Sequence, residues 1–373
     1  MKIAVNTRLL LSNKLEGIGR FSFELLKHIV IAHPEHEFHF IFDRPYAQEF
    51  IFADNVIAHV ASPPARHPIL WFIYFEFTIP IVLHKIKPDI FLSPDGWIPL
   101  HLKVKTIDVI HDLNFEHHPE FIKPVVRRYY QYFFHRFAKK ADHIVTVSNF
   151  TRMDIHQLYD IPLDKISVVF NAANQIFIPL KNETKQLVRD EFCDGNPFFL
   201  FIGLIHKRKN LDNIFKAFDL FKIEDGKNTK LIVVGDKKWW KGDIENAFLE
   251  MTYKNDVVFM GHLPIEKVAH LMASAIALLY PSLFEGFGIP IVEAFCAETA
   301  VITSNITSMP EIAEDAAITV NPFSIAEIKD AMCLLVNDDL LRSHLINRGK
   351  ILREKYSWKK SAQELWKLIE SIS

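Results

Sequence analysis

Two glutamates flank a glycine-containing turn in the segment EGFGIPIVEAF, residues 285–295. The two glycines let the backbone approach a ligand closely, and Pro290 suits the first position of a helix. Backbone N–H groups at such a helix start favour an anion such as phosphate. The carboxylate of Glu285, and that of Glu293 in the expected first helical turn, could accept hydrogen bonds from sugar hydroxyls. Both carboxylates could instead cap the helix and complement its dipole.

A run of three cations lies in GLIHKRKN, residues 203–210, between an expected strand and an expected helix. Lys207, Arg208 and Lys209 would then follow the carboxyl end of the strand, which is the edge where open α/β sheets bind ligands. Arginine offers a planar pair of donors and lysine a compact charge, so the run suits a diphosphate. A solvated basic loop is the alternative.

The first half of the chain offers two weaker candidates. Gly17 and Gly19 occupy an expected turn in LEGIGRFSFELL, where a third glycine of a dinucleotide fingerprint is replaced by Ser22. A plain tight turn therefore explains them as well as contact with a phosphate or an acceptor. His111 and Asp112 end the expected strand TIDVIHD, and a packed histidine is the alternative to a catalytic one.

Two segments are candidates for contact with a membrane surface. Residues 121–140 interleave aromatic side chains with cations and contain no acidic residue, although we favour an ordinary surface helix with its aromatics in the core. The most apolar run, residues 69–83, includes Glu76 and Pro80. It is too short to span a bilayer, which takes about 20 apolar residues, so we expect a buried or an interfacial helix.

Composition narrows the class of protein. A chain of 373 residues with 49% hydrophobic and 24% charged residues predicts a globular protein, which we divide into two domains. The net charge of −2 gives no overall basic field for nucleic acid. Three widely spaced cysteines fit a reducing compartment, and the N-terminus lacks the pattern of a signal peptide, so we expect a cytoplasmic protein. The absence of Asp-x-Asp, Cys-x-x-Cys and His-x-x-x-His patterns favours a site without metal.

Short β-branched runs alternate with amphipathic stretches, which is typical of parallel sheets covered by helices. In the first half we expect strands at 2–6, 37–42, 56–60, 89–94, 106–112, 143–148 and 166–171, and helices at 19–32, 70–86, 122–140 and 149–159. In the second half we expect strands at 198–204, 230–235, 257–261, 275–280, 300–304 and 316–320, and helices from Asn210, near 265–274 and from Pro290. The polar residues 172–195 lose this rhythm and are expected to connect the domains. The predicted fold class is α/β, with two doubly wound domains facing across a cleft.

Together these segments resemble the family 4, or group 1, retaining glycosyltransferases, whose GT-B architecture has two Rossmann-like domains. EGFGIPIVEAF is similar to that family's motif of two glutamates separated by seven residues, and GLIHKRKNLDNIFKAF to its phosphate-binding turn. VIHDLNFEHHPE resembles the His-Asp segment of a mannosyltransferase-rich branch. The resemblance covers nearly the whole chain. It implies an acceptor-binding domain at 1–175, a nucleotide-sugar-binding domain at 176–355 and a C-terminal helix at 356–373 that crosses back to the first domain.

The resemblance also implies roles for single residues. Glu293 would bind the ribose of a nucleotide sugar, Glu285 would contact the transferred sugar, and His111 would lie beside it. Arg208 and Lys209 would neutralise the leaving diphosphate. Further donor contacts would come from Gly286, Phe287, Gly288 and Ile289, and contacts with a phosphate or the acceptor from Gly17, Gly19 and Asp112.

The implied reaction transfers a hexose, with mannose suggested by the branch, to a glycan or lipid-linked acceptor in the synthesis of a cell-surface polysaccharide such as lipopolysaccharide. Front-face attack, with the leaving phosphate taking the acceptor's proton, needs no nucleophile from the protein, unlike a retaining glycosidase. Domain closure would assemble the site. We expect no cofactor and no metal, the nucleotide sugar and the acceptor as partners, no nucleic acid, and peripheral contact with the inner membrane surface as a further expectation. The alternatives are a nucleotide-sugar epimerase of the same architecture and a non-catalytic sugar-nucleotide-binding subunit.

A few positions depart from the family's pattern. Glu298 and Ala300 stand where many members have a glycine and a proline, and Glu314 replaces the usual glycine before Asp-Ala. Leu204 stands where some members carry an arginine that binds phosphate, so Arg208 would take more of that role.

Overall fold

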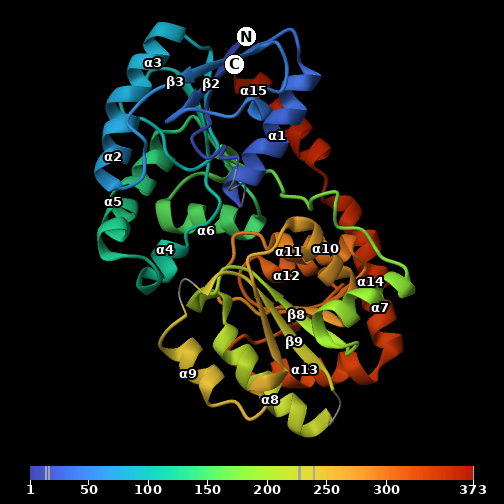
Figure 1. The fold of residues 1–373 in the computed structure, drawn as a ribbon. Coiled ribbons are helices and arrows are strands. Elements are labelled where there is room, and N and C mark those ends of the chain that lie inside the picture. Colours follow the sequence, from blue (N-terminus) through green and yellow to red (C-terminus); the bar gives the residue numbers. More distant parts are fainter. Residues whose placement is uncertain (13–14, 16, 226–227, 238–239, 373) are drawn as a thin grey trace. The chain divides into compact units, whose positions relative to one another are not determined.

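The computed structural model describes residues 1–12, 15, 17–225, 228–237 and 240–372. The chain divides into two compact units (Figure 1). Unit 1 comprises Met1–Asn171 with Ser357–Ser373, and unit 2 comprises Ala172–Tyr356. Each unit has its own sheet and its own core.

Unit 1 is built on a parallel sheet of seven strands in the order β3-β2-β1-β4-β5-β6-β7. The strands are β1 (Lys2–Asn6), β2 (Glu37–Phe42), β3 (Val56–Val60), β4 (Ile90–Ser93), β5 (Lys105–Val109), β6 (His143–Thr146) and β7 (Ile166–Val168). Central strands read as continuous apolar runs because helices cover both faces of such a sheet. In β1, for example, Ile3, Ala4 and Val5 are all fully buried.

The helices of unit 1 lie between these strands and at the end of the chain. They are α1 (Ile18–Ala32), η1 (Gln48–Phe50), α2 (Pro68–Ile73), the π-helical turn η2 (Tyr74–Thr78), α3 (Ile79–Ile86), α4 (Asn114–His117), η3 (Pro119–Phe121), α5 (Pro124–Lys140), α6 (Asn149–Tyr159), η4 (Leu163–Lys165) and α15 (Trp358–Ile372). The last helix, α15, packs on α1. Its Trp358 ring meets the ring of Phe21 edge-on at 6.2 Å, so the end of the chain is part of unit 1.

Unit 2 is built on a parallel sheet of six strands in the order β10-β9-β8-β11-β12-β13. The strands are β8 (Phe198–Ile202), β9 (Lys230–Val234), β10 (Val257–Gly261), β11 (Ala277–Tyr280), β12 (Ala300–Ser304) and β13 (Ile318–Val320). The helices are α7 (Asn182–Cys193), η5 (Lys207–Lys209), α8 (Leu211–Asp225), α9 (Asp243–Leu249), η7 (Lys254–Asp256), α10 (Ile265–Ser274), α11 (Ile289–Cys296), α12 (Met309–Ala313), α13 (Ile325–Asn337), α14 (Asp339–Leu352) and η8 (Arg353–Lys355).

The prediction of an α/β fold with two Rossmann-like units is confirmed. In each sheet the strand order reverses at one point, between β1 and β4 in unit 1 and between β8 and β11 in unit 2. Ligands of open α/β sheets bind outside the carboxyl ends of the strands at this switch point.

Two local details differ from the expectations. Within the segment 172–195, expected to connect the domains, residues Asn182–Cys193 form α7, whose Arg189 guanidinium donates to the Ser274 carbonyl of unit 2. The strand β5 ends at Val109, so His111 and Asp112 lie in the loop beyond it. The helix α7 resembles a linker in the sequence because it is polar and buries only a narrow face. The strand β5 was expected to be longer because apolar residues continue past its last hydrogen-bonded residue, Val109.

Candidate active site

The residues that follow β8 and β11 lie together at the switch point of unit 2. The turn η5 comes after β8, and the segment Pro281–Gly288 comes after β11. The backbone N–H of Leu283 donates to the Arg208 carbonyl at 2.8 Å, and the Asn210 side-chain amide donates to the Pro281 carbonyl at 3.0 Å. These bonds hold the two segments against each other.

The carboxylate of Glu285 is shared by two cations of the η5 turn. Its Oε2 lies 2.9 Å from Nη1 of Arg208, and its Oε1 lies 2.6 Å from Nζ of Lys209. Burial alone would raise the pKa of Glu285, but the charges of Arg208 and Lys209 outweigh burial and lower it to about 2. Glu285 is therefore ionised at neutral pH.

Tyr280, the last residue of β11, is a site residue that sequence reasoning missed. Nζ of Lys209 lies 2.7 Å from the Tyr280 hydroxyl and 4.6 Å from the centre of its ring. The tyrosine is buried, and its hydroxyl fixes the position of the lysine ammonium. The available sequence signal was its place at the carboxyl end of a strand directly before Pro281.

Lys207 is separated from the other two cations of the run. Its Nζ lies 2.9 Å from a carboxylate oxygen of Asp212 and 2.7 Å from one of Asp243. The three consecutive cations therefore face two different sets of acids. Arg208 and Lys209 are brought together with Glu285, while Lys207 is held by aspartates.

The turn after Glu285 reverses the chain into α11. Gly288 adopts a φ of 100°, a left-handed conformation that favours glycine, and α11 begins at Ile289. The Ser308 hydroxyl lies 2.8 Å from the Glu285 carbonyl and 3.1 Å from the Phe287 carbonyl, so it supports the turn. The Phe287 ring is buried against Tyr356, which leaves its backbone as the part that a ligand could contact.

Glu293 lies in the second turn of α11 and is half-buried. The expectation that it occupies the first turn is wrong, because the helix already begins at Ile289. Capping of the N-terminus therefore does not explain this carboxylate.

In unit 1, His111 has a defined tautomer. Its Nε2 lies 2.9 Å from the Pro94 carbonyl oxygen, and a carbonyl only accepts, so Nε2 carries the proton of the neutral ring. Burial lowers the pKa of His111, although the hydrogen bond to Pro94 and the nearby aspartates oppose this effect. The ring is also packed edge-on against Phe21 at 4.8 Å. The neutral imidazole thus keeps Nδ1 as its acceptor.

The other three candidates of unit 1 have structural roles. Asp112 accepts a hydrogen bond from the backbone N–H of Asn114 at 2.9 Å. Gly17 precedes α1 with a φ of 48°, whereas Gly19 lies inside the helix rather than in the predicted turn. A side chain at Gly19 would place its Cβ only 2.8 Å from the Leu9 carbonyl oxygen, so close packing alone requires glycine there.

Each of the two units is matched mainly by a different protein-family model. The model of the glycosyl transferases group 1 matches residues 183–351, and the model of glycosyltransferase family 4 matches residues 15–175. The chain belongs to the group 1, family 4 glycosyltransferases. The match to both models makes this protein a hexosyltransferase, as predicted.

The glycosyltransferase is similar to O-antigen chain mannosyltransferase B of Escherichia coli, with 28% identity over 92% of this chain and 93% of that protein. Among solved structures, it resembles sucrose-phosphate synthase from Thermosynechococcus elongatus with a TM-score of 0.80, 15% identity and coverage of 99% and 98% of the two chains. It also resembles Anabaena HepE in complex with UDP-glucose, with a TM-score of 0.76, 14% identity and full coverage of both chains. The predicted GT-B fold is confirmed.

At two departures from the family's pattern, this glycosyltransferase keeps the backbone conformation that glycine favours. Glu298 has a φ of 57° and Glu314 has a φ of 43°, both in the left-handed region. Their carboxylates pair with Lys350 at 3.0 Å and with Lys355 at 2.8 Å, respectively. The backbone path is thus retained although the usual glycine is replaced.

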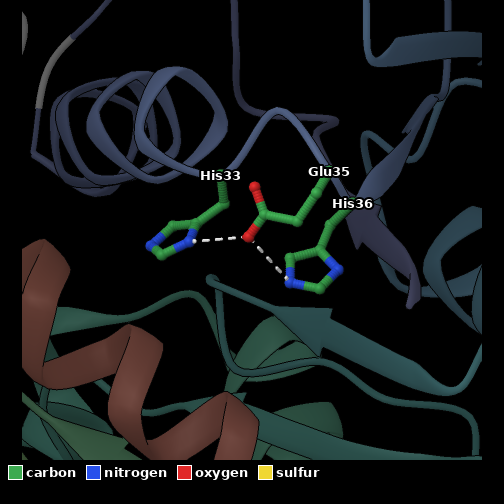
Figure 2. Close-up of side chains that lie close together, drawn as sticks. All are labelled: His33, Glu35 and His36. Atoms are coloured by element: carbon green, nitrogen blue, oxygen red, sulfur yellow. Dashed lines mark hydrogen bonds and ion pairs between the residues drawn. The ribbon is translucent and has the colours of Figure 1, made fainter.

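One cluster of side chains could hold a metal ion among the described residues. The potential ligand atoms of His33, Glu35 and His36 lie within 4.8 Å of one another (Figure 2). The cluster lies between the end of α1 and the start of β2, which is the amino edge of the sheet and therefore opposite to the switch point. His36 Nδ1 already contacts the Met1 ammonium at 2.9 Å, and His33 stacks on Trp366. We assign the cluster a role in packing the chain ends, and the expectation of a metal-independent reaction stays a prediction.

Proposed function

We propose that this glycosyltransferase moves a mannosyl group from a nucleotide-diphosphate sugar to a glycan or lipid-linked acceptor, with retention of configuration, in cell-surface polysaccharide synthesis. The sharing of Glu285 by Arg208 and Lys209 carries the proposal. The name of the E. coli relative supports mannose and O-antigen synthesis, and the Anabaena complex supports a nucleotide-sugar donor.

The positive charges of Arg208 and Lys209 complement the negative charge of a diphosphate. In the structure the single carboxylate of Glu285 offsets only one of their two positive charges, and a bound diphosphate would offer them a second anionic partner. As the bond between the sugar C1 and the phosphate oxygen breaks, negative charge grows on the leaving diphosphate. Cations that are already held in place by a buried tyrosine and by backbone bonds would stabilise that charge with little reorganisation.

Glu285 is proposed to accept hydrogen bonds from the transferred sugar. A carboxyl group with a pKa of about 2 has no proton to donate at neutral pH, and two adjacent cations weaken it as a nucleophile. The acceptor oxygen would therefore attack C1 from the side of the leaving group. Its proton would pass to the departing phosphate oxygen, so no acid, base or nucleophile from the protein is required.

The remaining contacts form part of the same proposal. Glu293 would bind the ribose, and the backbone of Gly286, Phe287, Gly288 and Ile289 would contact the sugar and diphosphate. His111, as a neutral ring with Nδ1 unprotonated, would accept a hydrogen bond from a sugar hydroxyl. Gly17 and Asp112, in their loops, and Gly19, in the first turn of α1, would lie near a phosphate or the acceptor.

The reaction is proposed to need no metal, because side-chain cations take the role that Mg²⁺ has in other transferases. The enzyme would act in the cytoplasm, with its lipid-linked acceptor at the inner membrane face. An epimerase or a subunit without turnover is not favoured by any feature of the site, and the E. coli relative that matches over 92% of this chain is a mannosyltransferase by name.

A panel of nucleotides and their sugars tests the proposal. We expect GDP or GDP-mannose to raise the melting temperature more than UDP, dTDP, ADP and their sugars. Donor hydrolysis should then fall in Glu293→Ala but not in Glu266→Ala, a control on the exposed side of α10. A protein that responds to no nucleotide would overturn the transferase proposal, and a response to UDP-glucose alone would overturn mannose.

A further inference from the structure

The helical run α2–η2–α3 of unit 1 has an unusual distribution of apolar residues. By length and composition alone, Pro68–Ile86 could cross a membrane, yet only 28% of its most apolar window is buried in the protein. A core helix with this composition would be mostly buried. One face of the run does pack into unit 1, through Trp71, Tyr74, Phe75, Ile79 and Leu83. The run therefore has an inner face that is fixed to the protein and an outer face that is not.

The outer face carries a stripe of large apolar side chains. Ile69, Phe72, Phe77 and Ile81 are exposed by 68%, 41%, 56% and 58%, and Ile73 lies beside them. We call these five residues the apolar stripe. The Phe72 ring lies 5.8 Å from that of Phe77 and 6.1 Å from that of Phe133 on α5, so the stripe is continuous with the neighbouring helix. Figure 1 shows α2 and α3 following one another along one side of unit 1, with α5 next to α2.

Positive charge brackets the stripe at both ends. Arg66 and His67 precede the run, and Lys85 and Lys87 lie at its end, all of them exposed. The only acidic residue between positions 66 and 88 is Glu76. Its carboxylate accepts a hydrogen bond from the Leu100 N–H at 3.2 Å, so it is engaged by the protein rather than placed among the stripe. The neighbouring helix α5 carries the exposed cation Arg128, and the exposed Lys123 directly precedes that helix.

We propose that the apolar stripe inserts into the headgroup region of an anionic phospholipid bilayer, with α2–η2–α3 lying parallel to its plane. Interfacial helices combine an apolar face with flanking cations that attract anionic lipids. The run does not span the bilayer, because its inner face is packed against the core of unit 1. The cations of α5 alone would place membrane contact on that helix, whereas the apolar stripe places it on α2 and α3, with α5 contributing cations.

A second copy of the chain fits the stripe less well than a membrane does. Both ends of the run are basic, so either a parallel or an antiparallel pairing of two stripes would place cations against cations. An anionic lipid surface complements both ends at once. Binding of the stripe to a membrane would bring the enzyme to a lipid-linked acceptor. This purpose of the binding rests on the proposed function.

Flotation of the full chain with vesicles tests the inference. We expect binding to vesicles of phosphatidylcholine with about one quarter phosphatidylglycerol, and much weaker binding to phosphatidylcholine alone. The variant Phe77→Glu/Ile81→Glu should lower partitioning about tenfold or more, because the added carboxylates are repelled and the apolar contacts are lost. The variant Lys85→Glu/Lys87→Glu should weaken binding to the anionic vesicles only. Leu340→Glu, at an 84% exposed position on α14, is the matched control and should bind like the wild type.

Two outcomes would overturn the inference. One is unchanged vesicle binding by Phe77→Glu/Ile81→Glu, or binding by no form of the protein. The other is a wild-type dimer in sedimentation that the same variant dissociates, without vesicle binding, which would assign the stripe to self-association. Melting curves with nucleotides, recorded without lipid, separate these results from a failure of the proposed transferase activity.

Discussion

Oε1 of Glu285 lies 2.6 Å from Nζ of Lys209, although the two residues are 76 positions apart in the chain. The pair joins the segment after β11 to the turn after β8. A buried ion pair is costly to break, by about 3–5 kcal/mol when one partner is removed, because the other charge is then left unpaired. With Arg208 as the second cation on the same carboxylate, the cluster keeps one net positive charge that can meet an anionic ligand.

Replacing Glu285 with glutamine separates nucleotide binding from transfer. The amide keeps the shape of the side chain but no longer neutralises Arg208 and Lys209, so GDP should bind at least as tightly as to the wild type. Transfer should fall by about 100-fold, in the range seen when one preorganised polar contact with a transition state is removed. Calorimetry and steady-state kinetics measure the two effects, with Glu298→Gln as the control. An unchanged kcat would contradict the role of Glu285 with the sugar.

The lowered pKa of Glu285 predicts the acid sensitivity of the fold. The pKa is about 2 in the folded protein against the usual 4.5, so the stabilisation is present in full above pH 4.5 and is lost as the pH falls from 4.5 towards 2. This shift corresponds to about 3 kcal/mol of unfolding free energy. Urea unfolding between pH 7 and pH 3 should show a smaller loss of stability in Glu285→Gln than in the wild type. Parallel curves would contradict the prediction.

Tyr280→Phe tests whether the tyrosine hydroxyl positions Lys209. The ring stays in place while the 2.7 Å hydrogen bond is lost, so we expect the KM for the donor to rise about three- to tenfold, with a smaller change in kcat. Tyr356→Phe is the matched control, because its buried hydroxyl donates to the Ile312 carbonyl within the same unit. Loss of stability without a change in KM in both variants would show that Tyr280 is only structural.

Glu314→Gly should stabilise the protein. A residue other than glycine in the left-handed region costs about 1–2 kcal/mol, whereas the exposed ion pair with Lys355 contributes about 0–1 kcal/mol. The net gain should be about 1 kcal/mol in urea unfolding, without loss of transfer. Glu266→Gly, inside α10, should show the opposite sign because glycine is unfavourable within a helix. Destabilisation by Glu314→Gly would mean that its ion pair outweighs the backbone cost.

The strands of both sheets were predictable because each one is marked by a short apolar run in the sequence itself. Ile3–Val5 of β1 and Phe198–Phe201 of β8 are continuous apolar runs, and a parallel sheet covered on both faces buries them fully. The cations of η5 and the two glutamates near α11 were also predictable, since they follow strands whose carboxyl ends meet at the switch point.

The contacts between distant residues were not predictable. Whether Lys207 faces the same partner as Arg208 depends on Asp243, which is 36 positions away and comes from another helix. The role of Tyr280 depends on the path of Lys209, and its place at a strand end marks it as a site candidate without indicating which residue it contacts. The exposure of the apolar stripe depends on which face of α2–η2–α3 packs inward, and the π-helical turn η2 shifts that face midway.

We propose that Arg208 and Lys209, but not Lys207, bind the diphosphate of the donor. Calorimetry with GDP, and with UDP, should be compared for the wild type and for Lys207→Gln, Arg208→Gln and Lys209→Gln. We expect Arg208→Gln and Lys209→Gln each to weaken binding about tenfold or more, since a charge-assisted hydrogen bond contributes about 1.5–3 kcal/mol. Lys207→Gln should stay within about twofold of the wild type, because its ammonium is held by Asp212 and Asp243. Equal losses in all three variants, or no loss in Arg208→Gln, would contradict it.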